Sequence, residues 1–192
     1  MHSLSPRCTA ELPLLRRKCK AQACRLTNRA RLDGFKPVRL LTVSKKNKRA
    51  SEDDLSSVYA KRCSFYSPLE EIFLRPNPKN MPDNPALQKA HEGAELLTKI
   101  RKGDFCIALH EGGNSFTSRQ FAELILRASE THDAIAIIIG GPYGLSEPVL
   151  SRADVVLSVS PMTLNHRVAR VLLLEQLYRA HTITKNQRYH HE

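Results

Sequence analysis

The sequence predicts an α/β domain with a mostly parallel sheet and flanking helices, and three observations support this fold class. Short β-branched apolar runs alternate along the chain with segments of helical periodicity. Residues 134–139, AIAIII, form the most apolar run of the chain, which is typical of a parallel strand buried on both faces. A glycine-rich turn, GGPYG at residues 140–144, follows at once.

The N-terminal region differs from the rest of the chain in its charge. Residues 1–49 carry 14 basic and 2 acidic side chains, whereas the remaining residues carry 16 basic and 17 acidic ones. The net charge of +11 is therefore almost wholly N-terminal, and RNA binding by the folded part requires local basic patches. Residues 1–36, arginine-rich and without a long apolar stretch, predict a transit peptide for a plastid (chloroplast) or mitochondrion, with the chloroplast slightly preferred. A disordered basic arm that contacts RNA is the alternative, and we expect the folded domain at residues 37–192.

Cysteine and histidine spacing gives no indication of a metal site. The five cysteines include no C-x-x-C pair, and the histidines have no recognised ligand spacing with cysteine or carboxylate. We therefore expect neither a bound metal nor a disulfide framework. No apolar run approaches the roughly 20 residues that a membrane-spanning helix needs, so we expect no membrane partner.

In the first half of the domain, strands are predicted at residues 38–43 and 69–74, with a helix between them. Ser51 and Asp54 resemble a capping box at the start of that helix. A proline-rich stretch then opens a second helix, which is expected to end near Gly103. The apolar residues at helical spacing predict the buried face of this second helix: Leu87, Ala90, Ala94, Leu97 and Ile100.

In the second half, strands are predicted at residues 105–109, 134–139 and 155–159. Thr117 and Gln120 form a capping box before a helix between the first two of these strands. Asn165 is expected to cap a long final helix. The continuous apolar block at residues 171–174 of this helix is wider than a usual buried stripe, and it fits a subunit interface or enclosure within the domain equally well.

Three predicted strands end in segments that suit a ligand site, at residues 110–113, 140–144 and 160–164. In a parallel sheet these segments meet at one edge, where open α/β folds bind ligands. Glycine lets the backbone approach a ligand closely, although a turn that only connects two elements is the alternative. The dinucleotide fingerprint and the P-loop pattern are both absent, which disfavours a doubly wound nucleotide-binding enzyme.

The segments IIIGGPYGLS, LSVSPMTLNH and VLLLEQLYRAHTITK, with the closing YHH, resemble the RlmH family of the SPOUT methyltransferase superfamily. The resemblance implies an S-adenosylmethionine-dependent enzyme that methylates N3 of a pseudouridine in large-subunit ribosomal RNA. It also implies a C-terminal trefoil knot. A homodimer is implied as well, with the tail of one subunit near the cofactor pocket of the other. A non-catalytic RNA-binding factor for ribosome assembly, with the same fold, is the alternative function.

The resemblance also implies roles for individual residues. The positions expected to contact S-adenosylmethionine are Leu109, Gly140, Val159, Ser160, Pro161, Met162, Thr163 and Leu164. Arg179, Tyr189 and His190 are expected to act on the RNA, with His190 as the base that takes the N3 proton and Arg179 stabilising the charge that results. The basic residues along the final helix and after it predict an RNA-binding patch: Arg167, Arg170, Lys185 and Arg188. The sequence departs from the common bacterial pattern at Ser44, Asn165 and His181.

Overall fold

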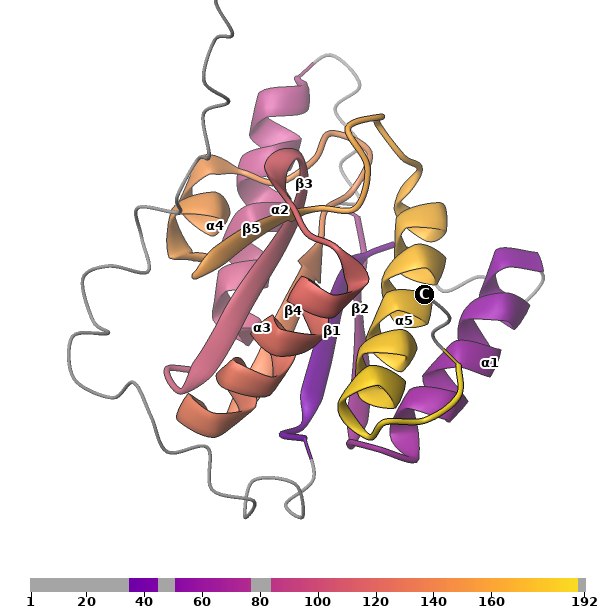
Figure 1. The fold of residues 1–192 in the computed structure, drawn as a ribbon. Coiled ribbons are helices and arrows are strands. Elements are labelled where there is room, and N and C mark those ends of the chain that lie inside the picture. The colour runs from indigo at the N-terminus through magenta and orange to yellow at the C-terminus, as the bar shows by residue number, and fades with distance from the viewer. Residues whose placement is uncertain (1–34, 45–50, 77–83, 190–192) are drawn as a thin grey trace, which may run out of the picture. The chain divides into compact units, whose positions relative to one another are not determined.

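Strands and helices alternate along the part of the chain that the structure, a computed structural model, describes: residues 35–44, 51–76 and 84–189 (Figure 1). Residues 1–34 of the predicted leader lie outside this part. The elements in chain order are β1 (Val38–Val43), α1 (Ser51–Ser64), β2 (Leu69–Leu74), α2 (Pro85–Lys99), β3 (Asp104–Ser115), α3 (Ser118–Thr131), β4 (Ala134–Ile139), α4 (Glu147–Arg152), β5 (Val155–Ser158) and α5 (His166–Thr184).

The strands form one parallel sheet in the order β2-β1-β4-β3-β5. β4 lies at its centre, paired with β1 on one side and β3 on the other, and all six of its residues are buried. Ile137, for example, pairs with Leu40 of β1 and with Ile107 of β3. The predicted α/β class with a mostly parallel sheet is confirmed.

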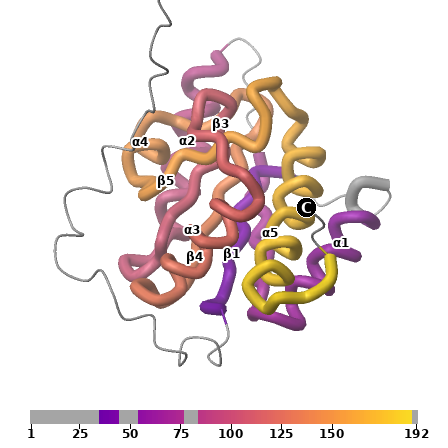
Figure 2. Tube along the Cα trace, viewed as in Figure 1, coloured from indigo at the N-terminus to yellow at the C-terminus, as the bar shows by residue number. Residues whose placement is uncertain are grey.

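Helices cover both faces of the sheet (Figure 1). α1, α3 and α5 pack on the face that receives Ile135, Ile137 and Ile139 of β4. α2 and α4 pack on the other face, which receives Ile138. The trace in Figure 2 runs from β4 through α4 and β5 into α5, so the C-terminal third of the chain contributes to both layers. None of the described helices is long and apolar enough to cross a membrane.

The predicted helix caps of the second half are present. At α3 the Thr117 hydroxyl accepts a hydrogen bond from the Gln120 backbone N–H at 3.2 Å, and the Gln120 side chain accepts one from the Thr117 N–H at 2.9 Å. Asn165 accepts a hydrogen bond from the Arg167 N–H at 2.9 Å and starts α5. These contacts satisfy backbone donors that a helix start would otherwise leave without partners.

The buried face of α2 agrees with the prediction only in part, since Leu97 and Ile100 pack against the core as expected. Leu87 is 46% exposed, and Ala90 and Ala94 are also exposed. The residues that α2 buries are Gln88, Glu92, Gly93 and Leu96. Gly93 explains the rotation, because a Cβ at this position would lie 1.9 Å from the Ser146 hydroxyl beside α4. The close approach to α4 therefore turns the glycine side of the helix inward, against its apolar periodicity.

β3 is longer than predicted and takes in residues 110–113, which were expected to form a loop. Its pairing with β5 shifts register between Leu109 and Asn114, so the intervening residues bulge out of the ladder. The short helix α4 was not predicted, because six residues give too little periodicity to recognise. The trefoil knot implied by the resemblance stays a prediction.

The apolar block of α5 serves both the core and the surface. Leu173 and Leu174 are buried against α1 and α3, whereas Val168 and Leu172 are each 40% exposed. The exposed pair lies four residues apart and therefore on one side of the helix.

Shortening a side chain at the centre of β4 should destabilise the fold in proportion to the volume removed. We expect Ile137→Val to lower the free energy of unfolding by about 1 kcal/mol and Ile137→Ala by about 3 kcal/mol, because Ile137 is fully buried. Urea unfolding measures both values, with the exposed substitution Glu130→Ala as the control. Equal, small effects of all three substitutions would contradict a tightly packed β4.

Candidate functional site

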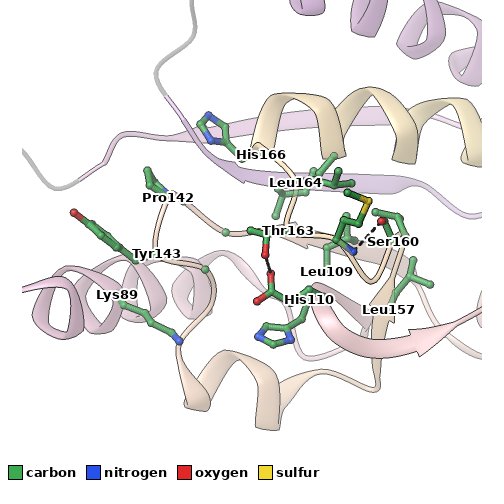
Figure 3. Close-up of a pocket in the computed structure, with 18 residues that line it drawn as sticks. Lys89, Leu109, His110, Pro142, Tyr143, Leu157, Ser160, Thr163, Leu164 and His166 are labelled. Carbon is green, nitrogen blue, oxygen red and sulfur yellow. Dashed lines mark hydrogen bonds between the residues drawn. The ribbon is translucent and has the colours of Figure 1, made fainter.

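A pocket of about 320 Å³ opens at the carboxyl edge of the sheet, where β4 and β5 end and β3 bulges (Figure 3). Such a volume suits a small cofactor. Seven of the eight residues predicted to contact the cofactor line this pocket: Leu109, Gly140, Val159, Ser160, Met162, Thr163 and Leu164. Pro161 is exposed and does not line it. Segments that are far apart in the sequence thus meet in one place because the sheet is parallel.

The glycine turn after β4 shapes one wall of the pocket. The Gly144 N–H donates to the Gly141 carbonyl at 3.0 Å, and Gly144 has a φ of 78°, which favours glycine. A Cβ at Gly140 would lie 2.7 Å from the carbonyl carbon of Gly144. At these glycines the wall is bare backbone, which a ligand can approach closely, and Pro142 and Tyr143 line the rest of it.

The opposite wall is held by hydrogen bonds within the loop after β5. The Ser158 hydroxyl donates to the Ser160 carbonyl at 2.9 Å, and the Ser160 hydroxyl accepts from the Met162 N–H at 3.0 Å. Thr163 donates from its hydroxyl to Glu111 of β3 at 3.1 Å, which ties this loop to the β3 bulge (Figure 3). These contacts order the loop around the pocket.

The pocket residues fit S-adenosylmethionine. Leu109, Leu157 and Leu164 offer apolar surface to an adenine ring, and the glycine turn offers close backbone contact. The amino-acid end of the cofactor carries a positive ammonium group and a negative carboxylate. Glu111 and Lys89, which line the pocket, have the opposite charges to match them. Lys89 comes from α2, and sequence reasoning missed it because nothing local places that helix beside the glycine turn. Among the described residues, no three histidine, cysteine, aspartate or glutamate side chains gather as a metal site.

A second group of polar side chains gathers around Glu175 near the end of α5; we call Glu175, Tyr178, Arg179 and Tyr189 the C-terminal cluster. Glu175 Oε1 accepts hydrogen bonds from Arg179 Nη2 at 2.6 Å and from the Tyr189 hydroxyl at 3.2 Å. The Arg179 guanidinium also lies over the Tyr189 ring, 4.9 Å from its centroid. Tyr178 contacts the same ring edge-on. Two of the three predicted catalytic residues are thus in contact with each other, and the third, His190, lies outside the described residues.

The pKa values of the C-terminal cluster suit donors rather than bases. The hydrogen bond from Arg179 to Glu175 raises the pKa of Arg179, which keeps the guanidinium charged. Burial raises the pKa of Tyr189 far above its ordinary value, and a hydrogen bond to Tyr59 and the charge of Glu175 raise it further. The Tyr189 phenol therefore keeps its proton.

The pocket and the C-terminal cluster lie at different ends of α5. Ala169 is the α5 residue farthest along the helix that lines the pocket. Arg179 follows ten residues later, which corresponds to about 15 Å along a helix. Within one chain, these two groups of residues do not form a single site.

The predicted RNA-binding residues have different environments. Lys185 and Arg188 are exposed, and Arg167 is half-buried at the pocket end of α5. Arg170 is a correction to the prediction, since it is only 6% exposed. Its guanidinium pairs with Glu71 of β2 at 2.8 Å and lies over the Phe73 ring. Arg170 therefore joins α5 to the sheet and presents no free surface to a phosphate group.

His181 anchors the end of α5. It is fully buried, in edge contact with Phe35 and stacked on Tyr66. Tyr66 in turn donates a hydrogen bond to Gln187, in the segment that leads to Tyr189. Burial, with a smaller contribution from Lys185, lowers the pKa of His181 to about 4, so the ring is neutral in the folded protein.

Comparison with known proteins gives a consistent result. A family model described as "Predicted SPOUT methyltransferase" matches residues 37–190. The chain is 38% identical over 157 residues to "Ribosomal RNA large subunit methyltransferase H" of Christiangramia forsetii, covering 80% of this chain and 98% of that protein. The protein of the same name from Nitratidesulfovibrio vulgaris is 39% identical over 158 residues, covering 82% and 100%. A protein of Arabidopsis thaliana whose name marks it as a candidate RNA methyltransferase is 38% identical over 159 residues, covering 81% and 80%.

The buried neutral His181 predicts a pH-dependent stability. Because the folded-state pKa, about 4, lies below the ordinary value of about 6.5, the contribution of His181 is complete above pH 6.5 and is lost as the pH falls toward 4. We expect His181→Phe to remove about 3 kcal/mol of this pH dependence. Urea unfolding at several pH values measures it, with the exposed His91→Gln as the control. An unchanged pH profile in His181→Phe would show that the ring does not titrate as stated.

Proposed function

The chain belongs to the SPOUT methyltransferase family, and on this premise we propose that it transfers a methyl group from S-adenosylmethionine to ribosomal RNA. The observation that carries the proposal is the pocket at the carboxyl edge of the sheet, which the bulge of β3 and the ends of β4 and β5 all border. The chain covers almost the whole length of two relatives named as large-subunit ribosomal RNA methyltransferases. We propose the same class of substrate here and, more finely, N3 of a pseudouridine as the acceptor.

The pocket residues bind and orient the cofactor, which supplies a methyl group on a positively charged sulfur. The glycine turn and the loop of residues 159–164 hold the adenosine part against apolar side chains. Lys89 and Glu111 hold the two charges of the amino-acid end. Because the methyl group and the nucleobase of the RNA need only be aligned, this positioning of the cofactor supplies much of the catalysis.

The C-terminal cluster is proposed to receive the RNA base. Arg179 stays positively charged and stabilises the negative charge that develops when N3 loses its proton. Tyr189 keeps its own proton and serves as a hydrogen-bond donor, so the base that accepts the N3 proton has to be another group. His190, the next residue, is proposed for that task, since a neutral imidazole accepts a proton near pH 7.

We further propose that the protein works as a homodimer. The separation of about 15 Å between the pocket end of α5 and Arg179 is too large for one RNA nucleobase to contact the cofactor pocket and Arg179 of the same chain. A second copy can bring its own C-terminal cluster to the pocket. Val168 and Leu172, on one side of α5 next to the pocket, offer the exposed apolar surface that such a contact requires.

The site of action is proposed from the composition of the leader. A leader through residue 36 was expected, but Phe35 packs on His181 in the core, so the segment proposed as a transit peptide ends before Phe35. It would direct the enzyme to the ribosomes of a chloroplast or a mitochondrion. Lys185 and Arg188 then supply part of the local positive charge that the nearly neutral domain needs to contact RNA.

Deleting the gene should remove one methyl group from organellar large-subunit ribosomal RNA, because the proposed function assigns this transfer to the chain. Mass spectrometry of nuclease digests locates the loss, and re-expression of the wild-type chain should restore it. Re-expression of Arg179→Ala should not. Full methylation in the deletion strain, together with binding of the purified wild-type protein to ribosomes, would favour the assembly-factor function instead.

Two inactive variants should complement each other if the site is shared between subunits. Gly140→Val fills the glycine wall of the pocket, and Arg179→Ala removes the guanidinium of the cluster. Each alone should be inactive, whereas random co-assembly should restore about a quarter of wild-type activity, since half of the dimers are mixed and each mixed dimer has one intact site. No recovery in a co-purified mixed dimer would place pocket and cluster of the same chain in one site.

A further inference from the structure

Buried charged side chains in the described part of the chain are paired, with one exception. Arg39 pairs with Asp104 at 2.7 Å, and Arg170 pairs with Glu71 at 2.8 Å. Glu92 of α2 is only 4% exposed and forms no ion pair with any described residue. A buried carboxylate without a cation is costly, so its place in the fold requires an explanation.

One oxygen of Glu92 has no partner. Oε1 accepts a hydrogen bond from the Gln88 side-chain amide at 2.8 Å, but Oε2 is fully enclosed and has no hydrogen-bond partner among the described residues. This oxygen lies against the glycine turn, since a Cβ at Gly141 would come within 2.7 Å of it. Gly141 itself lines the pocket. Oε2 of Glu92 therefore lies behind the wall of the pocket, and the backbone of the glycine turn separates this oxygen from the pocket.

We propose that Glu92 is a specificity residue that selects the positively charged methyl donor over the product. This rests on the proposed function. S-adenosylmethionine carries a sulfonium, and in the reaction its C–S bond breaks, the electron pair stays on sulfur and the methyl group bonds to N3 of the base. The product, S-adenosylhomocysteine, therefore has a neutral sulfur. A fixed negative charge behind the glycine wall favours the donor and releases the product.

The charge, more than the shape, of Glu92 has this effect. A glutamine keeps nearly the same shape and can still accept a hydrogen bond from Gln88, but it removes the negative charge. The glycine at 141 belongs to the same arrangement, because any larger residue would push the turn away from Glu92. α2 consequently buries its polar side beneath the pocket, which also accounts for the exposed Leu87 and Ala94.

The test compares the binding of both cofactor forms to Glu92→Gln by calorimetry. We expect the dissociation constant of S-adenosylmethionine to rise about tenfold, because a favourable charge–charge attraction is lost, and that of S-adenosylhomocysteine to change much less. Glu95→Gln is the matched control, since Glu95 is exposed on the same helix and the change in net charge is identical. The control should leave both constants as in the wild type. An unchanged ratio of the two constants in Glu92→Gln would overturn the proposal.

Glu92→Asp provides a second, independent measurement. The shorter aspartate keeps the negative charge but places it farther from Gly141. We expect this variant to retain most of the preference for S-adenosylmethionine even if its thermal stability is lower. Loss of the preference in Glu92→Asp as complete as in Glu92→Gln would indicate a structural role and contradict the proposal. Wild-type protein that binds neither cofactor form would instead overturn the proposed function.

Discussion

The complete burial of β4 at the centre of the sheet is the constraint on which the rest of the structure depends. Its side chains contribute to the cores on both faces, so a shift of one residue in register would exchange the alanines and isoleucines that each core receives. Its end therefore delivers the glycine turn to a fixed place beside the bulge of β3 and the end of β5. The pocket follows from this packing, because its walls are the loops that the core holds in position.

The second structural constraint is α5, a single helix of 19 residues that borders the pocket and carries most of the C-terminal cluster. Its first turn borders the pocket, and its last turns carry the C-terminal cluster, with buried leucines between them that attach the helix to α1 and α3. A rigid helix keeps the two regions apart within a chain. This separation is the reason why we propose that a second copy completes the site.

Charge acts locally in this domain. The high net charge of the chain comes from the N-terminal region, while single buried groups determine the electrostatics of the folded part. Arg170 shows how tertiary contacts change a residue's role, because its pairing with Glu71 turns a predicted RNA contact into a structural link. Glu92 is the opposite case, a buried carboxylate with one oxygen left without a hydrogen-bond partner, for which we proposed an interaction with a cationic ligand.

Local signals in the sequence determined a large part of this protein. The bounds of β1, β2 and β4, the caps at Thr117 and Asn165, and the glycine turn all follow from short patterns that act through neighbouring residues. Most pocket residues follow too, since parallel strands must end at one edge. The inward face of α2, the burial of Arg170 and the contribution of Lys89 to the pocket were decided only by the tertiary structure. Each depends on the surface of an element distant in sequence, and periodicity within one segment carries no information about that surface.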